Sequence, residues 1–85
     1  MSDHPTEFQG DILQTIRDSI VERLPDAVVE AAGSGGHFTI AVTSKEFAGK
    51  GPVDAQRLVY GAITHLMKGH LAPIHAVDSL KTKVP

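Results

Sequence analysis

Apolar residues recur at a spacing of four along residues 7–24, which predicts an amphipathic helix over that segment. Thr6 and Gln9 match a capping box at its start, and Pro25 ends it. The side chains expected to face a core are Phe8, Ile12, Leu13, Ile16, Ile20, Val21 and Leu24.

After this helix the pattern changes to alternation, which predicts two strands joined by a turn. The segments are AVVEAA (27–32), GSGG (33–36) and HFTIAVT (37–43), and the glycines supply the positive φ angles of a hairpin. One face of the second strand consists of Phe38, Ile40 and Val42, and the other of His37, Thr39 and Ala41. GSGG also matches the GxxG loop of KH nucleic-acid-binding domains, but that loop joins two helices. Because GSGG joins two strands here, we interpret the match as coincidental.

The second half of the chain predicts a helical pair followed by a third strand. SKEFAG (44–49) is typical of one capped helical turn closed by glycine, and Pro52 opens a longer helix that runs to about Lys68. KGHLAP is the exit loop, and PIHAVDSLK (73–81) alternates like a strand. The helix positions expected to face the core are Ala55, Val59, Ala62, Ile63, Leu66 and Met67.

This order of elements predicts an α+β fold, αββααβ, in which the helices cover one face of a three-stranded mixed sheet. The helical crossover permits parallel pairing of the second and third strands. Phe38, Ile40, Val42, Ile74 and Ala76 would then face the helices. His37 and His75 share the opposite phase at the beginnings of their strands. These beginnings lie about 4.8 Å apart if the register matches, so the two imidazoles are expected to converge on the open face.

Composition limits the chemistry that is available to this chain. Its 85 residues, 41% hydrophobic and 21% charged, are typical of one globular domain spanning residues 1–85. No apolar run reaches the roughly 18 residues of a membrane helix, and the N-terminus does not resemble a signal peptide, so we expect a cytoplasmic protein without membrane contact. There is no cysteine, so any metal ligand must be a carboxylate or one of the five histidines at positions 4, 37, 65, 70 and 75.

Charge is divided unevenly along the chain. Residues 1–42 carry two basic and seven acidic residues (net −5), and the remainder carries six basic and three acidic residues (net +3). No dense basic patch with interleaved aromatics occurs, so at most weak nucleic-acid binding is expected. There is no nucleophile–base set, phosphate loop or pair of carboxylates at fixed spacing, so we expect a binding module rather than an enzyme.

Several segments together resemble the BolA family. They are Ser44, Phe47, Gly49, Lys50 and Val53, then QRLVYG (56–61) and IHAV (74–77), preceded by HF in a strand. The resemblance covers roughly residues 8–82. Gln56 and Arg57 before LVYG are more similar to the acid-stress, IbaG-like bacterial branch than to BolA itself.

The resemblance implies a KH-like fold and a partnership with monothiol glutaredoxins of the CGFS type. In such complexes a [2Fe-2S] cluster is shared, held by the glutaredoxin cysteine, a glutathione thiolate and the histidine of the IHA segment, here His75. A second ligand, Cys or His, usually comes from the loop between the first two strands; the loop EAAGSGG contains neither, and His37 at its end is the residue available. The chain alone is expected to be a colourless monomer that forms a heterodimer with the glutaredoxin and serves in iron–sulfur trafficking, assembly or stress regulation.

Simpler roles remain open for each candidate residue. His75 can be a half-exposed strand residue bonded to backbone, and His37 a strand-entry residue that bonds the turn. His4, His65 and His70 are interpreted as surface groups. The candidate partner contacts are Arg57, Tyr60, Lys50 and Ala76, although Tyr60 can equally cover the core edge and Lys50 can be a solvated loop lysine. The alternative function is that of a KH-like nucleic-acid-binding transcriptional regulator of the stress response.

Overall fold

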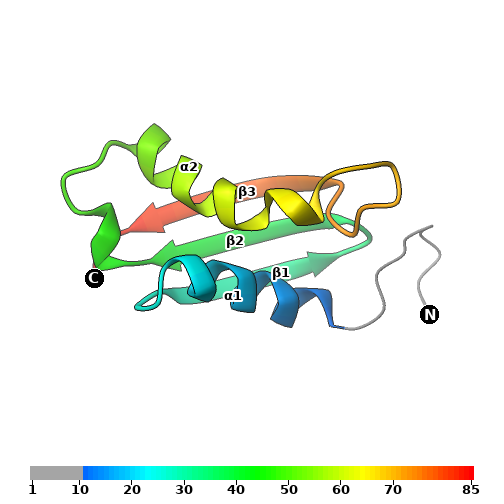
Figure 1. Ribbon diagram of the computed structural model, residues 1–85, viewed down its shortest axis with the longest axis horizontal. Helices are drawn as coiled ribbons and strands as arrows, with labels where there is room; N and C mark the ends of the chain where they lie inside the picture. Colours follow the sequence, from blue (N-terminus) through cyan, green and yellow to red (C-terminus); the bar gives the residue numbers. More distant parts are fainter. Residues whose placement is uncertain (1–10) are drawn as a thin grey trace.

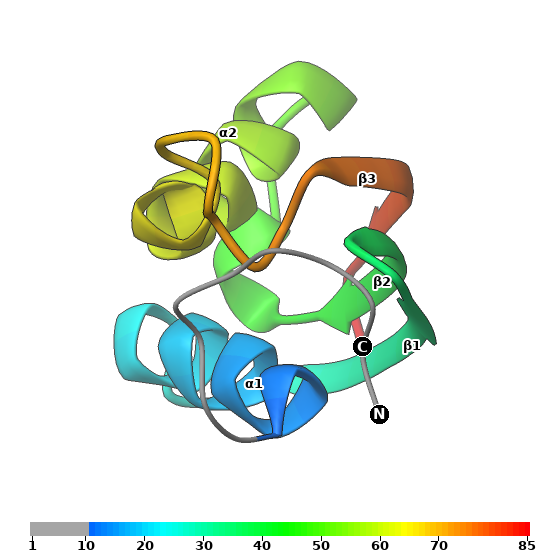
Figure 2. The ribbon, with the colours of Figure 1, turned by 90° about the vertical axis from the view of Figure 1, so that its right-hand side faces the viewer.

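The computed structural model describes residues 11–85 and consists of two α-helices, two short 3₁₀ turns and three strands (Figure 1). In chain order these are α1 (Ile12–Arg23), β1 (Val28–Ser34), β2 (His37–Thr43), η1 (Lys45–Phe47), α2 (Pro52–Ile63), η2 (Thr64–Leu66) and β3 (Ala76–Lys83). The strand order is β1-β2-β3, with β1 antiparallel and β3 parallel to β2. Both helices lie on one side of this mixed sheet (Figure 2). The predicted α+β fold and its topology are therefore confirmed.

Helix α1 starts later than the apolar periodicity predicts. Asp11 has an extended backbone, and its carboxylate accepts a hydrogen bond from the backbone N–H of Gln14 at 3.2 Å, so it is the N-cap. The predicted helix is therefore wrong at residue 11, while the capping box and Phe8 lie outside the described residues. The predicted end is confirmed, because Leu24 is the C-cap.

A hairpin joins β1 and β2 as predicted, but its turn is shorter than the expected segment 33–36, because Gly33 and Ser34 are paired in β1. Ser34 pairs with His37, so Gly35 and Gly36 make a two-residue turn with φ values of 64° and 83°. Positive φ at both central residues is the geometry that matches the twist of the flanking strands. The GSGG segment thus closes a β-hairpin and does not join helices.

The connection from β2 to α2 is fixed by Asp26, which precedes β1. Ser44 is fully buried, and its hydroxyl donates a hydrogen bond of 2.7 Å to one carboxylate oxygen of Asp26. The backbone N–H of Lys45 donates to the other oxygen at 2.8 Å. Both bonds lower the pKa of Asp26, and the bond from Ser44 has the larger effect. The predicted capped turn at residues 44–49 is confirmed as η1, followed by Gly49 at a φ of 77°.

The second long helix begins at Pro52 as predicted but changes form before its expected end. Its α-helical part stops at Ile63, and η2 continues the chain to Leu66. Among the described residues, no helix is both long enough and apolar enough to cross a membrane.

The core lies between the two helices and the inner face of the sheet. The strands contribute Phe38, Ile40 and Val42, which are at most 2% exposed, and the loop before β3 contributes Ile74 at 1%. The fully buried side chains from the helices are Ile16, Ile20, Val59 and Ile63. Burying one such side chain is worth about 1.5–3 kcal/mol, so this layer provides most of the driving force for folding. The other face of the sheet, which we call the open face, carries His37, Thr39, Ala41 and their register partners.

An irregularity in β3 reverses one predicted orientation. Phe38 pairs with Val77, but Thr39 pairs with Ser79, so Asp78 is an extra residue that bulges from the ladder. Ala76 pairs with His37 and therefore lies on the open face, whereas Val77 packs against the core. The prediction that Ala76 faces the helices is wrong, and the strand itself spans residues 76–83 rather than 73–81.

Candidate functional site

The beginning of β3 is held against the hairpin turn by the carbonyl of Gly36. This oxygen accepts hydrogen bonds from the backbone N–H groups of His75 at 2.8 Å and Ala76 at 2.9 Å. Successive N–H groups of a regular strand point in opposite directions, so two bonds to one oxygen show that the chain is kinked here. His75 consequently lies just before β3, at a position fixed by the turn.

The side chain of His75 packs over Gly36. Gly36 is buried, and His75 is exposed. A Cβ atom added to Gly36 would lie 2.7 Å from Cγ and 2.8 Å from Nδ1 of the imidazole. Gly36 also has a φ of 83°, so glycine is required both by the turn and by the histidine. The sequence indicated only the first of these two reasons.

His37 is held on the open face by a partner that the sequence analysis missed. Its Nδ1 lies 3.2 Å from Oδ1 of Asp78, and the two side chains are 59% and 55% exposed. Asp78 is the bulged residue of β3. A carboxylate at Nδ1 favours the tautomer in which Nε2 carries the lone pair, which is the usual arrangement behind a metal-binding histidine.

The two histidines are neighbours, but they do not lie opposite each other. His37 pairs with Ala76, so His75 is displaced by one residue from the matched register that the sequence analysis assumed. No group of three or more His, Cys, Asp or Glu side chains able to hold a metal ion occurs within residues 11–85. The described residues therefore place two imidazoles near each other and do not form a complete metal site.

The other candidate contacts lie elsewhere, except for Ala76, which is next to His75. Lys50 lies in the loop before α2, at the end of the molecule away from the beginnings of β2 and β3 (Figure 1). Arg57 is exposed on α2, with its guanidinium 3.7 Å from the carboxylate of Asp54. Tyr60 packs against the core, as one of its two predicted roles required. The structure thus does not gather these residues into one site.

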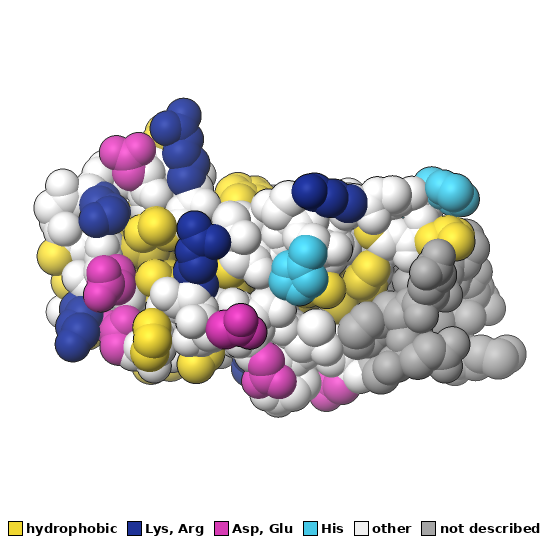
Figure 3. Space-filling view, in the orientation of Figure 1, with side chains coloured by type: hydrophobic (Ala, Val, Ile, Leu, Met, Phe, Trp, Pro, Cys, Tyr) yellow, Lys and Arg dark blue, Asp and Glu magenta, His cyan; other side chains and the backbone are white. Residues whose placement is uncertain are grey.

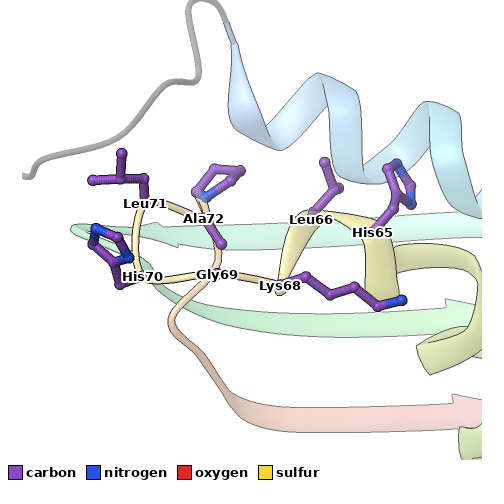
Figure 4. Close-up of a pocket in the computed structure, with 8 residues that line it drawn as sticks. His65, Leu66, Lys68, Gly69, His70, Leu71 and Ala72 are labelled. Carbon is purple, nitrogen blue, oxygen red and sulfur yellow. The ribbon is translucent and has the colours of Figure 1, made fainter.

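The loop between η2 and β3 forms a hollow of about 410 Å³ beside the core (Figure 4). His65, Lys68 and His70 are exposed at its edge, which confirms the interpretation of the two histidines as surface groups. Side chains of both charges are mixed over the helical face, without a single basic patch (Figure 3). The apolar residues that line the hollow are Leu66, Leu71, Ala72 and Pro73.

The architecture is that of a small two-layer α/β domain, with an exposed histidine at the junction of the hairpin turn and the parallel strand. The sequence matches the family model described as "BolA-like protein" over residues 6–85. The chain belongs to the BolA-like family.

Individual relatives agree with this assignment. The chain is 35% identical over 71 residues to the DNA-binding transcriptional regulator BolA of Vibrio cholerae, covering 84% of this chain and 58% of the relative. It is 31% identical over 86 residues to BolA-like protein 1 of Mus musculus, covering 89% and 60%. The chain thus spans about three fifths of the length of these curated relatives. A BolA homologue from Coxiella burnetii superimposes with a TM-score of 0.71 at 36% identity, covering 85% of this chain and 88% of that one.

Proposed function

We propose that this protein is a binding module that shares a [2Fe-2S] cluster with a monothiol glutaredoxin and glutathione. The observation that carries the proposal is His75, an exposed residue held at the hairpin turn because its own backbone N–H and that of Ala76 both donate to the carbonyl of Gly36. The complex would act in iron–sulfur cluster trafficking or assembly, or in iron and stress regulation. The role is one of binding, not of catalysis.

The side chains available at this position fit such a cluster chemically. Imidazole is a good ligand for iron, and histidine replaces cysteine on one iron of Rieske clusters. When bound, the cluster supplies one-electron redox chemistry and a transferable iron–sulfur unit. With no cysteine in the chain, all thiolate ligands must come from the partner and glutathione.

His75 would be the principal ligand and His37 the second. Asp78 would hold the ring of His37 through Nδ1 and leave Nε2 for iron. Gly36 would hold His75 at the turn, because its carbonyl binds the backbone and its bare α-carbon lies against the ring. Imidazole binds protons and metals through the same nitrogen, so ligation by these histidines would weaken as the pH falls.

The test is reconstitution of the full chain with a CGFS glutaredoxin, glutathione, iron and sulfide, followed by visible absorption and circular dichroism. We expect the chain alone to be colourless and the mixture to give a coloured heterodimer. His75→Ala should change the spectrum or shorten the lifetime of the cluster, while His37→Ala should have a smaller or comparable effect. His65→Ala, an exposed histidine elsewhere, is the matched control and should change nothing. A chromophore on the chain alone, or an unchanged complex with the His75 variant, would contradict the proposal.

Glutathione is kept reduced in the cytosol, so the proposal includes a cytoplasmic location.

A second candidate function follows from the V. cholerae relative, whose name is DNA-binding transcriptional regulator BolA. A KH-like regulator of stress transcription would bind nucleic acid through basic residues. The GSGG segment lies in a hairpin, and the basic residues are distributed over several elements, so we rank this candidate second.

A further inference from the structure

One row of residues across the open face of the sheet has opposite charges at its two ends. Glu30 of β1 pairs with Ala41 of β2, and Ala41 pairs with Lys81 of β3, so the three residues form one row across the sheet. Residues paired across a ladder point to the same side, which here is the side away from both helices (Figure 2). The row therefore presents an acid at one edge, a base at the other and a methyl group between them.

Both charged side chains of this row lack a side-chain partner among residues 11–85. Glu30 and Lys81 are exposed, and within residues 11–85 neither forms a side-chain hydrogen bond or an ion pair. Their strands are separated by β2, which places them about 10 Å apart at a strand spacing of about 4.8 Å. A hollow of about 370 Å³ lies over the row, lined also by Ala32, Thr39 and Ser79. The small side chains at the centre allow a second surface to approach closely.

We propose that the open face binds a second copy of this chain, in a two-fold dimer whose axis runs parallel to the strands through Ala41. This rotation places β1 of one copy over β3 of the other and leaves β2 facing β2. Glu30 of each copy then lies opposite Lys81 of the other, and the two Ala41 methyl groups meet on the axis. The contact is isologous, so one complementary pair is used twice. It needs no cluster and no glutaredoxin, and it does not rest on the function proposed above.

The size of the face sets the strength of this dimer. Strands β1 and β2 have seven residues each and β3 has eight, so the face covers about 14 × 23 Å, or roughly 320 Å² on each copy. A standard stable interface buries about 800 Å² on each partner, so this contact is weak and the chain is a monomer when dilute. If the contact extends over the whole face, it also covers His37, which lies two rows further along β2 beyond Thr39, and its partner Asp78.

Sedimentation equilibrium of the full chain, from micromolar to millimolar concentration at low salt, tests the proposal. We expect reversible dimerisation of the wild-type chain that weakens as salt is added. Glu30→Lys places two lysines opposite each other twice, and Lys81→Glu does the same with two acids. Each reversal should weaken association by about tenfold or more, since exposed ion pairs are individually modest but are reversed here at two positions. The matched controls are Glu22→Lys and Lys68→Glu, exposed residues outside the open face, and should leave association unchanged.

Two combinations separate specific pairing from a general effect of net charge. The double variant Glu30→Lys/Lys81→Glu keeps the net charge of −2 and should regain the wild-type association. An equimolar mixture of the two single variants should form a heterodimer more readily than either variant alone, because every contact then joins opposite charges. A wild-type chain that stays monomeric at millimolar concentration would overturn the proposal. Association that persists in both reversals, or that the mixture does not recover, would assign the interface to another surface.

Discussion

The imidazole of His75 lies directly over the α-carbon of Gly36, so closely that a Cβ at that position would lie 2.7 Å from Cγ of the ring. The carbonyl of the same glycine binds the backbone N–H of His75 at 2.8 Å. One residue of the hairpin turn thus determines both the backbone position and the side-chain environment of the proposed cluster ligand. Any larger residue at position 36 must displace the histidine.

Gly36→Ala therefore tests this relationship. We expect a loss of about 1–3 kcal/mol in the free energy of unfolding, because alanine is strained at positive φ, together with a large change in the NMR resonances of the His75 ring. Gly49→Ala is the matched control, since Gly49 has a φ of 77° but open space where its Cβ would stand. The control should lose similar stability and leave the His75 resonances in place. Unchanged His75 resonances in Gly36→Ala would show that the ring does not rest on the turn.

The contact between His37 and Asp78 gives a second prediction. Both side chains are more than half exposed, so Asp78→Ala should change the free energy of unfolding by only about 0.2–1 kcal/mol. The same variant should change the tautomer of His37, which ¹⁵N NMR reports through the chemical shifts of Nδ1 and Nε2. Asp18→Ala on α1 is the control and should leave the His37 shifts unaltered. A tautomer that does not respond would remove Asp78 from the proposed site.

Asp78 also shows why part of the site could not be predicted from the sequence. Alternation in PIHAVDSLK correctly places Ile74 in the core, because burial follows hydrophobic periodicity. The bulge at Asp78 depends on how β3 pairs with β2, and this pairing leaves no pattern in the side chains of one strand. The same irregularity gives Ala76 the opposite phase to Leu80 and so places it on the open face.

The boundaries of the helices were predictable in some places and not in others. The end of α1, the hairpin and the start of α2 were predictable because Pro25, the glycine pair and Pro52 each enforce a backbone conformation locally. The start of α1 was not, because Asp11 competes as a cap with an apolar periodicity that continues towards the N-terminus. Several neighbouring polar residues can act as the N-cap, and hydrophobic periodicity does not show which of them does.

Asp26 makes the stability of the fold sensitive to acid. Hydrogen bonds from Ser44 and Lys45 lower the pKa of its carboxyl in the folded chain below the value in the unfolded chain. The resulting stabilisation is present above the unfolded pKa, near 4, and is lost as the pH falls through the lower folded pKa. Asp26→Asn should therefore be less stable at pH 7 and show a weaker dependence on pH below about 4.

Urea unfolding of this variant across the acid range measures the effect. Asp54→Asn, an exposed acid on α2 whose contact with Arg57 is long at 3.7 Å, is the control and should behave like the wild-type chain. If Asp26→Asn keeps the full acid dependence of the wild-type chain, other carboxylates are responsible for it.

Packing of α2 against the sheet gives a prediction of larger size. Ile63 is fully buried, so Ile63→Ala should cost about 2–5 kcal/mol in the free energy of unfolding, through lost burial and the cavity that remains. Val53 on the same helix is 61% exposed, and Val53→Ala should stay within about 0.5 kcal/mol. Chemical denaturation of both variants checks the difference. Equal losses would show that the helix does not pack as described.

The last prediction separates the two candidate functions. Each phosphate that a protein neutralises releases counterions, so nucleic-acid binding weakens steeply with salt. The basic residues of the second half are distributed over η1, α2, β3 and the loops, so few of them can face one strand together: Lys45, Lys50, Arg57, Lys68, Lys81 and Lys83. We expect a Kd for nucleic acid no better than roughly 10⁻⁴–10⁻⁶ M at physiological salt, with little preference for sequence.

Glutaredoxin binding should behave differently, because it would depend on ligation at His75 more than on exposed charges. We expect the cluster-bearing heterodimer to persist at salt concentrations that abolish nucleic-acid binding, and to be weakened by His75→Ala. Lys50→Ala should reduce the affinity for nucleic acid and leave the heterodimer intact. Titration of both partners against salt decides between the functions, and sub-micromolar, sequence-selective DNA binding at physiological salt would place the regulator first.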